Sequence, residues 1–168
     1  YNEYSTGRPH VEGKDKDRFR SKYLDIPNEP LYPFGYGLSY TTFEVSDIHL
    51  DRTWMDTSGQ IEAEVTVKNT GKIYAGKEVV QVYYSAAGGV MEKPYQELAA
   101  YQKTKLLAPG ETEEIVLKYQ AEQMASYSEK EAAWILEKGD YIIRVGNSSA
   151  STKVAGVIEV CEDIQTLK

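Results

Sequence analysis

The sequence predicts an all-β protein in which two antiparallel sheets enclose one core. Three observations predict it. Apolar and polar residues alternate with a period of two, β-branched and aromatic residues fill the alternating segments, and glycine, proline and asparagine separate those segments. About seven such segments lie between Phe43 and Val160, which suits an immunoglobulin-like β-sandwich of roughly 100 residues.

The first three strands are expected between residues 43 and 85. Phe43–Leu50 is a strand with imperfect alternation, whereas Ile61–Lys68 alternates cleanly and predicts a strand with one buried face. Asn69-Thr70-Gly71 ends that strand with residues typical of turns. Glu78–Ser85 is apolar on both faces, which favours a central position in its sheet.

The second half of the chain continues the pattern. Further strands are expected at about Glu97–Leu106, Thr112–Tyr119, Tyr141–Val145 and Lys153–Val160, with a single helical turn at Ala121–Ala125. Trp134 should be largely buried. The residues expected between the two sheets are Ile61, Val65, Val67, Val80, Val82, Leu117, Ile143 and Val145.

The segment Pro30–Phe43 is unusual because it combines aromatic residues, glycines and prolines with almost no charge. Proline excludes regular helix, and glycine allows turns and close approach of the backbone. Its rings should pack against other groups, because aromatic side chains are mostly apolar. One interpretation is a loop that closes the end of the β domain.

Further motifs suggest a more specific interpretation. They are Lys68–Gly71, Ala75–Tyr83, Glu97–Lys103, Leu107–Glu111, Trp134, Glu137–Tyr141 and Val145–Ser149. With PLYPFGYGLSYTTF at residues 30–43, they resemble, in order and spacing, the linker and the fibronectin type III-like domain of family 3 glycoside hydrolases, the β-glucosidases and their relatives. In that family the linker joins this domain to an α/β sandwich domain.

The resemblance implies a domain organisation. Residues 1–40 would be a linker arm and a remnant of the α/β sandwich domain, 41–160 the fibronectin type III-like sandwich, and 161–168 a tail or linker. The partners would be the catalytic barrel and α/β sandwich domains of a parent enzyme, and a homodimer through a swapped arm is an alternative. The interface residues, expected to pack against the near end of the sandwich, are Leu31, Tyr32, Phe34, Tyr36, Leu38 and Tyr40.

The resemblance also implies that this chain carries no catalytic residue. Family 3 enzymes take their nucleophile, an aspartate, from the barrel and usually their acid/base glutamate from the α/β sandwich domain, and no segment here matches either motif.

Glu62 and Glu64 lie about 7 Å apart on one strand face. They stand side by side on an open sheet rather than flanking a sugar, so we interpret them as a solvated face. The chain alone should be inactive and should orient the catalytic domains.

No cofactor, metal, nucleic acid or membrane is expected as a partner. Cys161 is the only cysteine, and His10 and His49 are far apart in sequence, which argues against a metal site. Gly35-Tyr36-Gly37 lacks the third glycine of a dinucleotide-binding loop. The net charge of −7 disfavours nucleic acid and anionic membranes. The compartment stays open between the bacterial cytoplasm and secretion, and a soluble protein is expected.

An independent carbohydrate-binding or adhesion module is the alternative function. Saccharides stack on exposed, coplanar aromatic rings, and the candidates here are Tyr83, Tyr95, Tyr101 and Tyr127. Core or interface packing explains the same tyrosines, because the ring is apolar and the hydroxyl tolerates a wet edge. The direction in which the rings point distinguishes the two interpretations.

Overall fold

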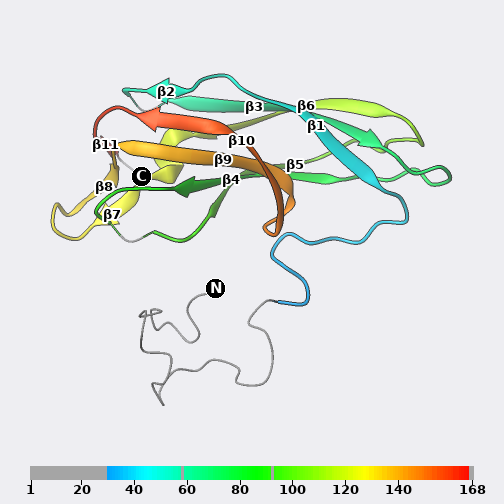
Figure 1. The fold of residues 1–168 in the computed structure, drawn as a ribbon, viewed down its shortest axis with the longest axis horizontal. Helices are drawn as coiled ribbons and strands as arrows, with labels where there is room; N and C mark the ends of the chain where they lie inside the picture. The colour runs from blue at the N-terminus through cyan, green and yellow to red at the C-terminus, as the bar shows by residue number, and fades with distance from the viewer. Residues whose placement is uncertain (1–29, 58, 92, 167–168) are drawn as a thin grey trace, which may run out of the picture. The chain divides into compact units, whose positions relative to one another are not determined.

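The computed structural model describes residues 30–57, 59–91 and 93–166. Its contacts divide the chain into two units, Tyr1–Phe34 and Gly35–Lys168, and every strand among the described residues lies in the second. Residues 1–29 of the arm expected at residues 1–40 lie outside the described residues. The elements, labelled in Figure 1, are β1 (Phe43–Leu50), β2 (Trp54–Met55), β3 (Gln60–Asn69), β4 (Val79–Ala86), β5 (Glu97–Lys103), β6 (Thr112–Gln120), η2 (Ala121–Met124), β7 (Ser126–Ser128), β8 (Ala133–Leu136), β9 (Gly139–Ser148), β10 (Ser151–Val160) and β11 (Ile164–Thr166).

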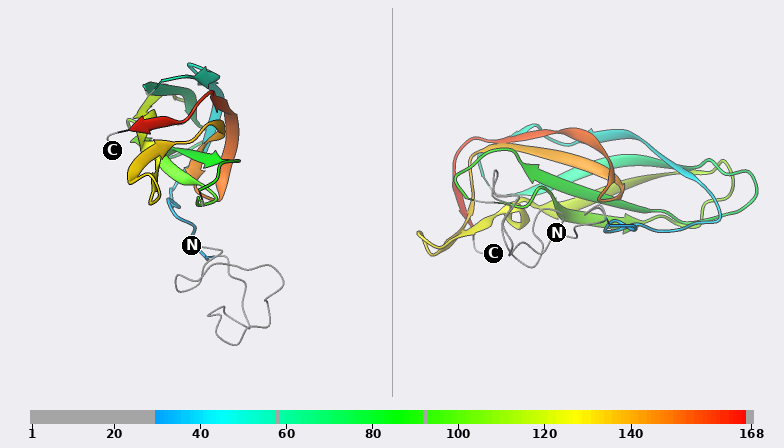
Figure 2. Two further views of the ribbon diagram at one scale, coloured as in Figure 1. Left: turned by 90° about the vertical axis from the view of Figure 1, so that its left-hand side faces the viewer. Right: turned by 60° about the horizontal axis from the view of Figure 1, so that its bottom comes forward.

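The second unit is a β-sandwich, which confirms the predicted fold class. One sheet has the strand order β1-β3-β6, and the other has the order β2-β10-β9-β4-β5. The two views in Figure 2 show these sheets facing each other across a common interior. A small third sheet, β11-β8-β7, lies in the same unit.

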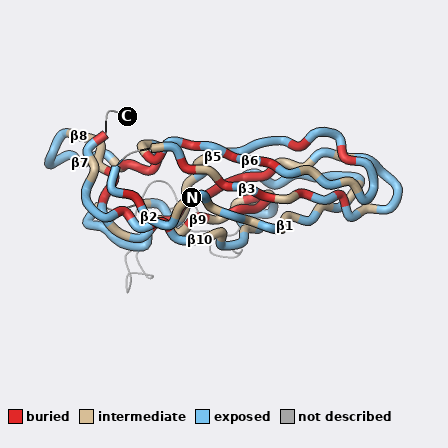
Figure 3. Tube along the Cα trace, turned by 90° about the horizontal axis from the view of Figure 1, so that it is seen from above, coloured by how far each residue is buried: buried red, intermediate tan, exposed pale blue. Residues whose placement is uncertain are grey.

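The core consists of the inward-facing residues of the two larger sheets. In β3, buried residues alternate with exposed or half-buried ones from Ile61 to Asn69, an alternation that Figure 3 shows along the tube. All eight residues expected between the sheets are at most 2% exposed, so that prediction is confirmed. Trp134 is half-buried and packs against the core.

The central position predicted for β4 is also confirmed, because this strand pairs with β5 on one side and β9 on the other. Val80, Val82 and Tyr84 face the core. Gln81 and Tyr83 face the opposite side of the sheet and are nevertheless buried. Other groups of the chain must therefore cover these two side chains on the side of the sheet that faces away from the core.

The imperfect alternation of β1 has a structural cause. The pairing of β1 with β3 shifts between Ser46 and His49, and Asp47 has a positive φ of 46°. This β-bulge changes which face the following residues point to. Val45 before the bulge and Ile48 and Leu50 after it therefore all pack against the core.

Several short elements were not expected from the sequence. These are β2, β7, β8 and β11, each with four residues or fewer. β11 lies within the stretch expected as a tail and pairs with β8. The helical turn expected at Ala121–Ala125 is present as η2.

Candidate domain interface

The linker is tied to the outer face of the five-stranded sheet through Gln81. The Gln81 side chain donates from Nε2 to the Gly35 carbonyl oxygen at 3.0 Å and to the Asn147 carbonyl oxygen at 2.8 Å. Its Oε1 accepts a hydrogen bond from the hydroxyl of Tyr83. The amide nitrogen of this buried side chain therefore donates once to the linker and once to the sheet, and its oxygen accepts from the sheet.

Only glycine suits position 35. Gly35 has a φ of 77°, in the left-handed region, and a Cβ atom there would lie 2.0 Å from Oε1 of Gln81. The close approach of the linker to β4 therefore depends on this glycine. Gly37, two residues later, has open space where a Cβ would be.

The rest of this outer face combines exposed apolar side chains with unsatisfied polar atoms. Val154 and Val157 of β10 and Leu98 and Tyr101 of β5 are exposed. Two buried atoms on β4 and β9, Oγ of Ser85 and Nε of Arg144, have no hydrogen-bond partner among the described residues. We refer to the face that these six residues and Gln81 form as the outer face.

A second feature of the outer face is the ring of Tyr95. The guanidinium carbon of Arg144 lies 6.0 Å from the centroid of this ring, which is at the limit of a cation–π contact. Unsatisfied donors and exposed apolar groups on one face are typical of a surface that another protein surface covers.

All six predicted linker residues have exposed side chains. Their exposed fractions run from 48% for Tyr36 to 93% for Tyr40. Leu38 and Tyr40 are 84% and 93% exposed, so the expected packing against the end of the sandwich is not seen for these two side chains. Tyr40 has one ring contact, edge-on to Tyr74 at 6.3 Å between centroids. Contact of these residues with other domains stays a prediction.

The loop between β4 and β5 is organised by a buried carboxylate. Glu137 accepts hydrogen bonds from the backbone nitrogen of Val90 at 2.8 Å and from the ammonium group of Lys93, and both charged side chains are at most 10% exposed. Burial raises the pKa of Glu137, but the hydrogen bonds from Lys93, Val90 and Met91 outweigh it and lower the pKa below 4.5. The loop is thus fixed to the strand region around Glu137.

Of the two glutamates considered on β3, Glu62 is engaged in a surface ion pair. Glu62 accepts a hydrogen bond from Nζ of Lys118 at 2.8 Å, and this contact is the main reason its pKa is lowered. A glycosidase acid needs the opposite shift, a raised pKa.

Among the described residues, no group of three or more His, Cys, Asp or Glu side chains is placed to hold a metal ion.

The four tyrosines considered for sugar stacking do not form one platform. Tyr83 is buried, Tyr127 packs edge-on against Trp134 with centroids 5.5 Å apart, and Tyr95 lies against Arg144. Tyr101 alone of the four is exposed without such a contact among the described residues. Trp54, which the sequence analysis did not single out, is 58% exposed.

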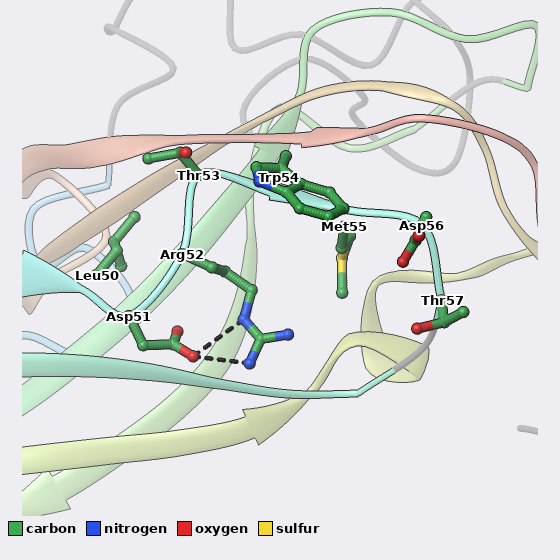
Figure 4. Close-up of a pocket in the computed structure, with 8 residues that line it drawn as sticks. All are labelled: Leu50, Asp51, Arg52, Thr53, Trp54, Met55, Asp56 and Thr57. Atoms are coloured by element: carbon green, nitrogen blue, oxygen red, sulfur yellow. Dashed lines mark hydrogen bonds and ion pairs between the residues drawn. The ribbon is translucent and has the colours of Figure 1, made fainter.

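Trp54 borders a pocket of about 510 Å³ that residues 50–57 line (Figure 4). Arg52 extends into it and is held there by Asp51.

Within the described part of the chain, no helix is long and apolar enough to cross a membrane.

Residues 78–149 match the family model of the fibronectin type III-like domain. The chain thus contains such a domain, in agreement with the sandwich and its strand order. β-Glucosidase A of Butyrivibrio fibrisolvens is 45% identical over 138 residues, which cover 73% of this chain and 16% of that protein.

Solved structures of β-glucosidases also contain a region similar to this chain in sequence and fold. β-Glucosidase 3B from Thermotoga neapolitana is 45% identical with a TM-score of 0.72, and the match covers 82% of this chain and 18% of that one. The β-glucosidase of Listeria innocua is 37% identical with a TM-score of 0.74, covering 96% and 22%. The chain belongs to the C-terminal, fibronectin type III-like region of the family 3 β-glucosidases, and it spans about one fifth of these relatives.

Proposed function

We propose that this chain is a non-catalytic structural module of a family 3 glycoside hydrolase that hydrolyses O-glycosyl bonds. It packs against the catalytic domains and sets their orientation through the linker and the outer face. The observation that carries the proposal is the hydrogen bond from Gln81 to Gly35, because it fixes the linker to the sheet face that also exposes apolar groups.

The composition of the outer face supports a protein partner. Contacts between domains of one chain typically bury about 600–1,500 Å² and are fairly polar. The outer face offers such a mixture, with Val154, Val157 and Tyr101 exposed beside the unsatisfied donor of Arg144. A partner with carbonyl or carboxylate oxygens would satisfy that donor.

A chimeric enzyme tests the proposal. In β-glucosidase 3B of Thermotoga neapolitana, the matching region is replaced by this chain, and hydrolysis of an aryl β-glucoside and thermal inactivation are measured. We expect an active chimera. Val157→Asp should shorten its half-life at elevated temperature, because a buried unpaired carboxylate is costly.

Val116→Asp is the matched control. Val116 is 40% exposed on β6 of the other sheet, and Val157 is 42% exposed on β10. Each substitution places the same charge on a similarly exposed strand position. If both variants inactivate at the same rate as the unmodified chimera, the outer face is not a domain interface.

A further inference from the structure

The backbone around Trp54 is held by β10, and the indole ring is exposed and directed away from the core. The strand β2 pairs with β10 in parallel, and Thr53 and Met55 accept backbone hydrogen bonds from Glu159 and Cys161, each at 2.9 Å. Met55 is buried in the core. Because successive residues of a strand point to opposite faces, Trp54 must face outward.

Polar groups beside the ring are fixed just as firmly. Asp51 exchanges hydrogen bonds with the backbone of Glu62, donating at 3.1 Å and accepting through Oδ1 at 2.9 Å. Its Oδ2 accepts from Nε and Nη2 of Arg52 at 2.9 and 2.7 Å. Nη1 of Arg52 makes no hydrogen bond to any described residue, so a directed donor points into the pocket.

The pocket has the volume of a small-molecule site and is an open hollow lined by residues 50–57. Its volume of about 510 Å³ lies within the roughly 300–1,000 Å³ that ligand pockets occupy. One aromatic face, one guanidinium and the exposed side chains of Thr53 and Asp56 line it. In Figure 4 the indole and the guanidinium border the same space.

The charge at the pocket disfavours an anionic ligand. Arg52 and Asp51 neutralise each other, and the net charge of −7 of the whole chain disfavours anions. An apolar protein surface over the pocket would leave Nη1 of Arg52 and the carboxylate of Asp56 without partners, which is unfavourable. The fitting ligand therefore has an apolar face and hydroxyl groups around its edge.

We propose that the Trp54 pocket binds a saccharide, with one pyranose ring stacked on the indole and its hydroxyl groups bonded to Arg52 and Asp56. A ring with all hydroxyl groups equatorial, as in β-linked glucose, presents the largest C–H face to an aromatic ring. Trp54 pairs with Glu159 of β10, so this site lies at the β2 edge of the same sheet, with β10 and β9 between it and Gln81 on β4.

The test is a calorimetric titration of the full 168-residue chain, once with cellopentaose and once with laminaripentaose. Tryptophan fluorescence in a Trp134→Phe background isolates the signal of Trp54. We expect a Kd on the order of 1 mM for at least one of the two sugars. No binding of either sugar at about 10 mM would overturn the proposal.

Variants identify the residues. Trp54→Ala should weaken binding about tenfold or more, and Trp54→Phe, which keeps an aromatic face, should weaken it less. Arg52→Met should weaken binding several-fold, and Tyr101→Ala, an exposed aromatic residue outside the pocket, should leave it unchanged. Thermal unfolding verifies that each variant is folded. Unchanged affinity in folded Trp54→Ala overturns the site, as does a loss in Tyr101→Ala equal to that in Trp54→Ala.

Discussion

Asn69 uses all of its side-chain hydrogen-bonding groups inside the sandwich. Its Nδ2 donates to the carbonyl oxygens of Tyr74 and Leu107 at 3.0 and 2.9 Å, and its Oδ1 accepts from Thr41 and Gly71 at 2.6 and 3.0 Å. The side chain is fully buried. From the sequence, Asn69 was identifiable only as a turn residue, because its partners lie up to 38 positions away.

We expect Asn69→Asp to lower the free energy of unfolding by about 3 kcal/mol. A carboxylate cannot donate to the two buried carbonyl groups, and each group left unpaired costs roughly 1–3 kcal/mol. Urea denaturation measures the change. The control is Gln165→Glu, the same amide-to-acid change at an exposed position of β11, which should change stability little. Equal stability of the two variants contradicts the role given to Asn69.

Glu137 should make the stability depend on pH. Its folded-state pKa lies below 4.5, so its stabilising effect is complete above that pH and is lost as the pH falls through the lower folded-state value. Glu137→Gln should therefore flatten the acid side of the stability curve, below about pH 5. Thermal unfolding across that range checks it, with exposed Glu129→Gln as control. If the stability of Glu137→Gln falls with pH as steeply as that of the wild type, Glu137 is not the cause of the pH dependence.

At the scale of the elements, alternation in the sequence predicted the core strands because each has one face on a common interior. It was uninformative for β1, where the bulge at Asp47 shifts the phase, and for β2 and β11, which are too short to show a period. The linker was recognisable by composition. Its contact with Gln81 was not, since the partners are 46 positions apart.

The bulge in β1 predicts opposite effects of two substitutions. Asp47 has a φ of 46°, a conformation that costs ordinary L-residues roughly 1–2 kcal/mol. Asp47→Val should lower the free energy of unfolding by about that amount, whereas Asp47→Gly should maintain or raise it. Glu44→Val, at an exposed position of the same strand, is the control. Chemical denaturation of the three variants measures these free energies of unfolding. A destabilised glycine variant would contradict the positive φ assigned to residue 47 in the bulge.

The linker should loosen when Gly35 is replaced. In Gly35→Val the valine is strained at a φ of 77° and its Cβ meets the Gln81 amide, so the linker or this amide must move and their hydrogen bond is disturbed, whereas Gly37→Val has open space. We expect chymotrypsin, which cuts after aromatic residues, to cleave between residues 32 and 40 several-fold faster in the first variant only. Thermal unfolding of the sandwich should stay unchanged in both. Equal cleavage rates would show that the contact with Gln81 does not hold the linker.

At the scale of the whole molecule, the family resemblance predicted which region of an enzyme this chain corresponds to. Sequence alone could not identify the outer face as the candidate interface. That required knowing that β4 is central, that Gln81 points outward, and that Val154 and Val157 lie on the same face of the sheet. Nor could it identify Trp54, whose direction depends on the pairing of β2 with β10.

Complementation is the most direct test of the structural role. β-Glucosidase 3B of Thermotoga neapolitana, truncated to remove the region that this chain matches, is mixed with the 168-residue chain, and release of nitrophenol from an aryl β-glucoside is measured. The chain alone should release none above background, because the family resemblance implies that both carboxylates of the mechanism come from other domains. The mixture should recover activity, and Val157→Asp should reduce that recovery. Hydrolysis by the isolated chain, or a mixture no more active than the truncated enzyme, would contradict the account.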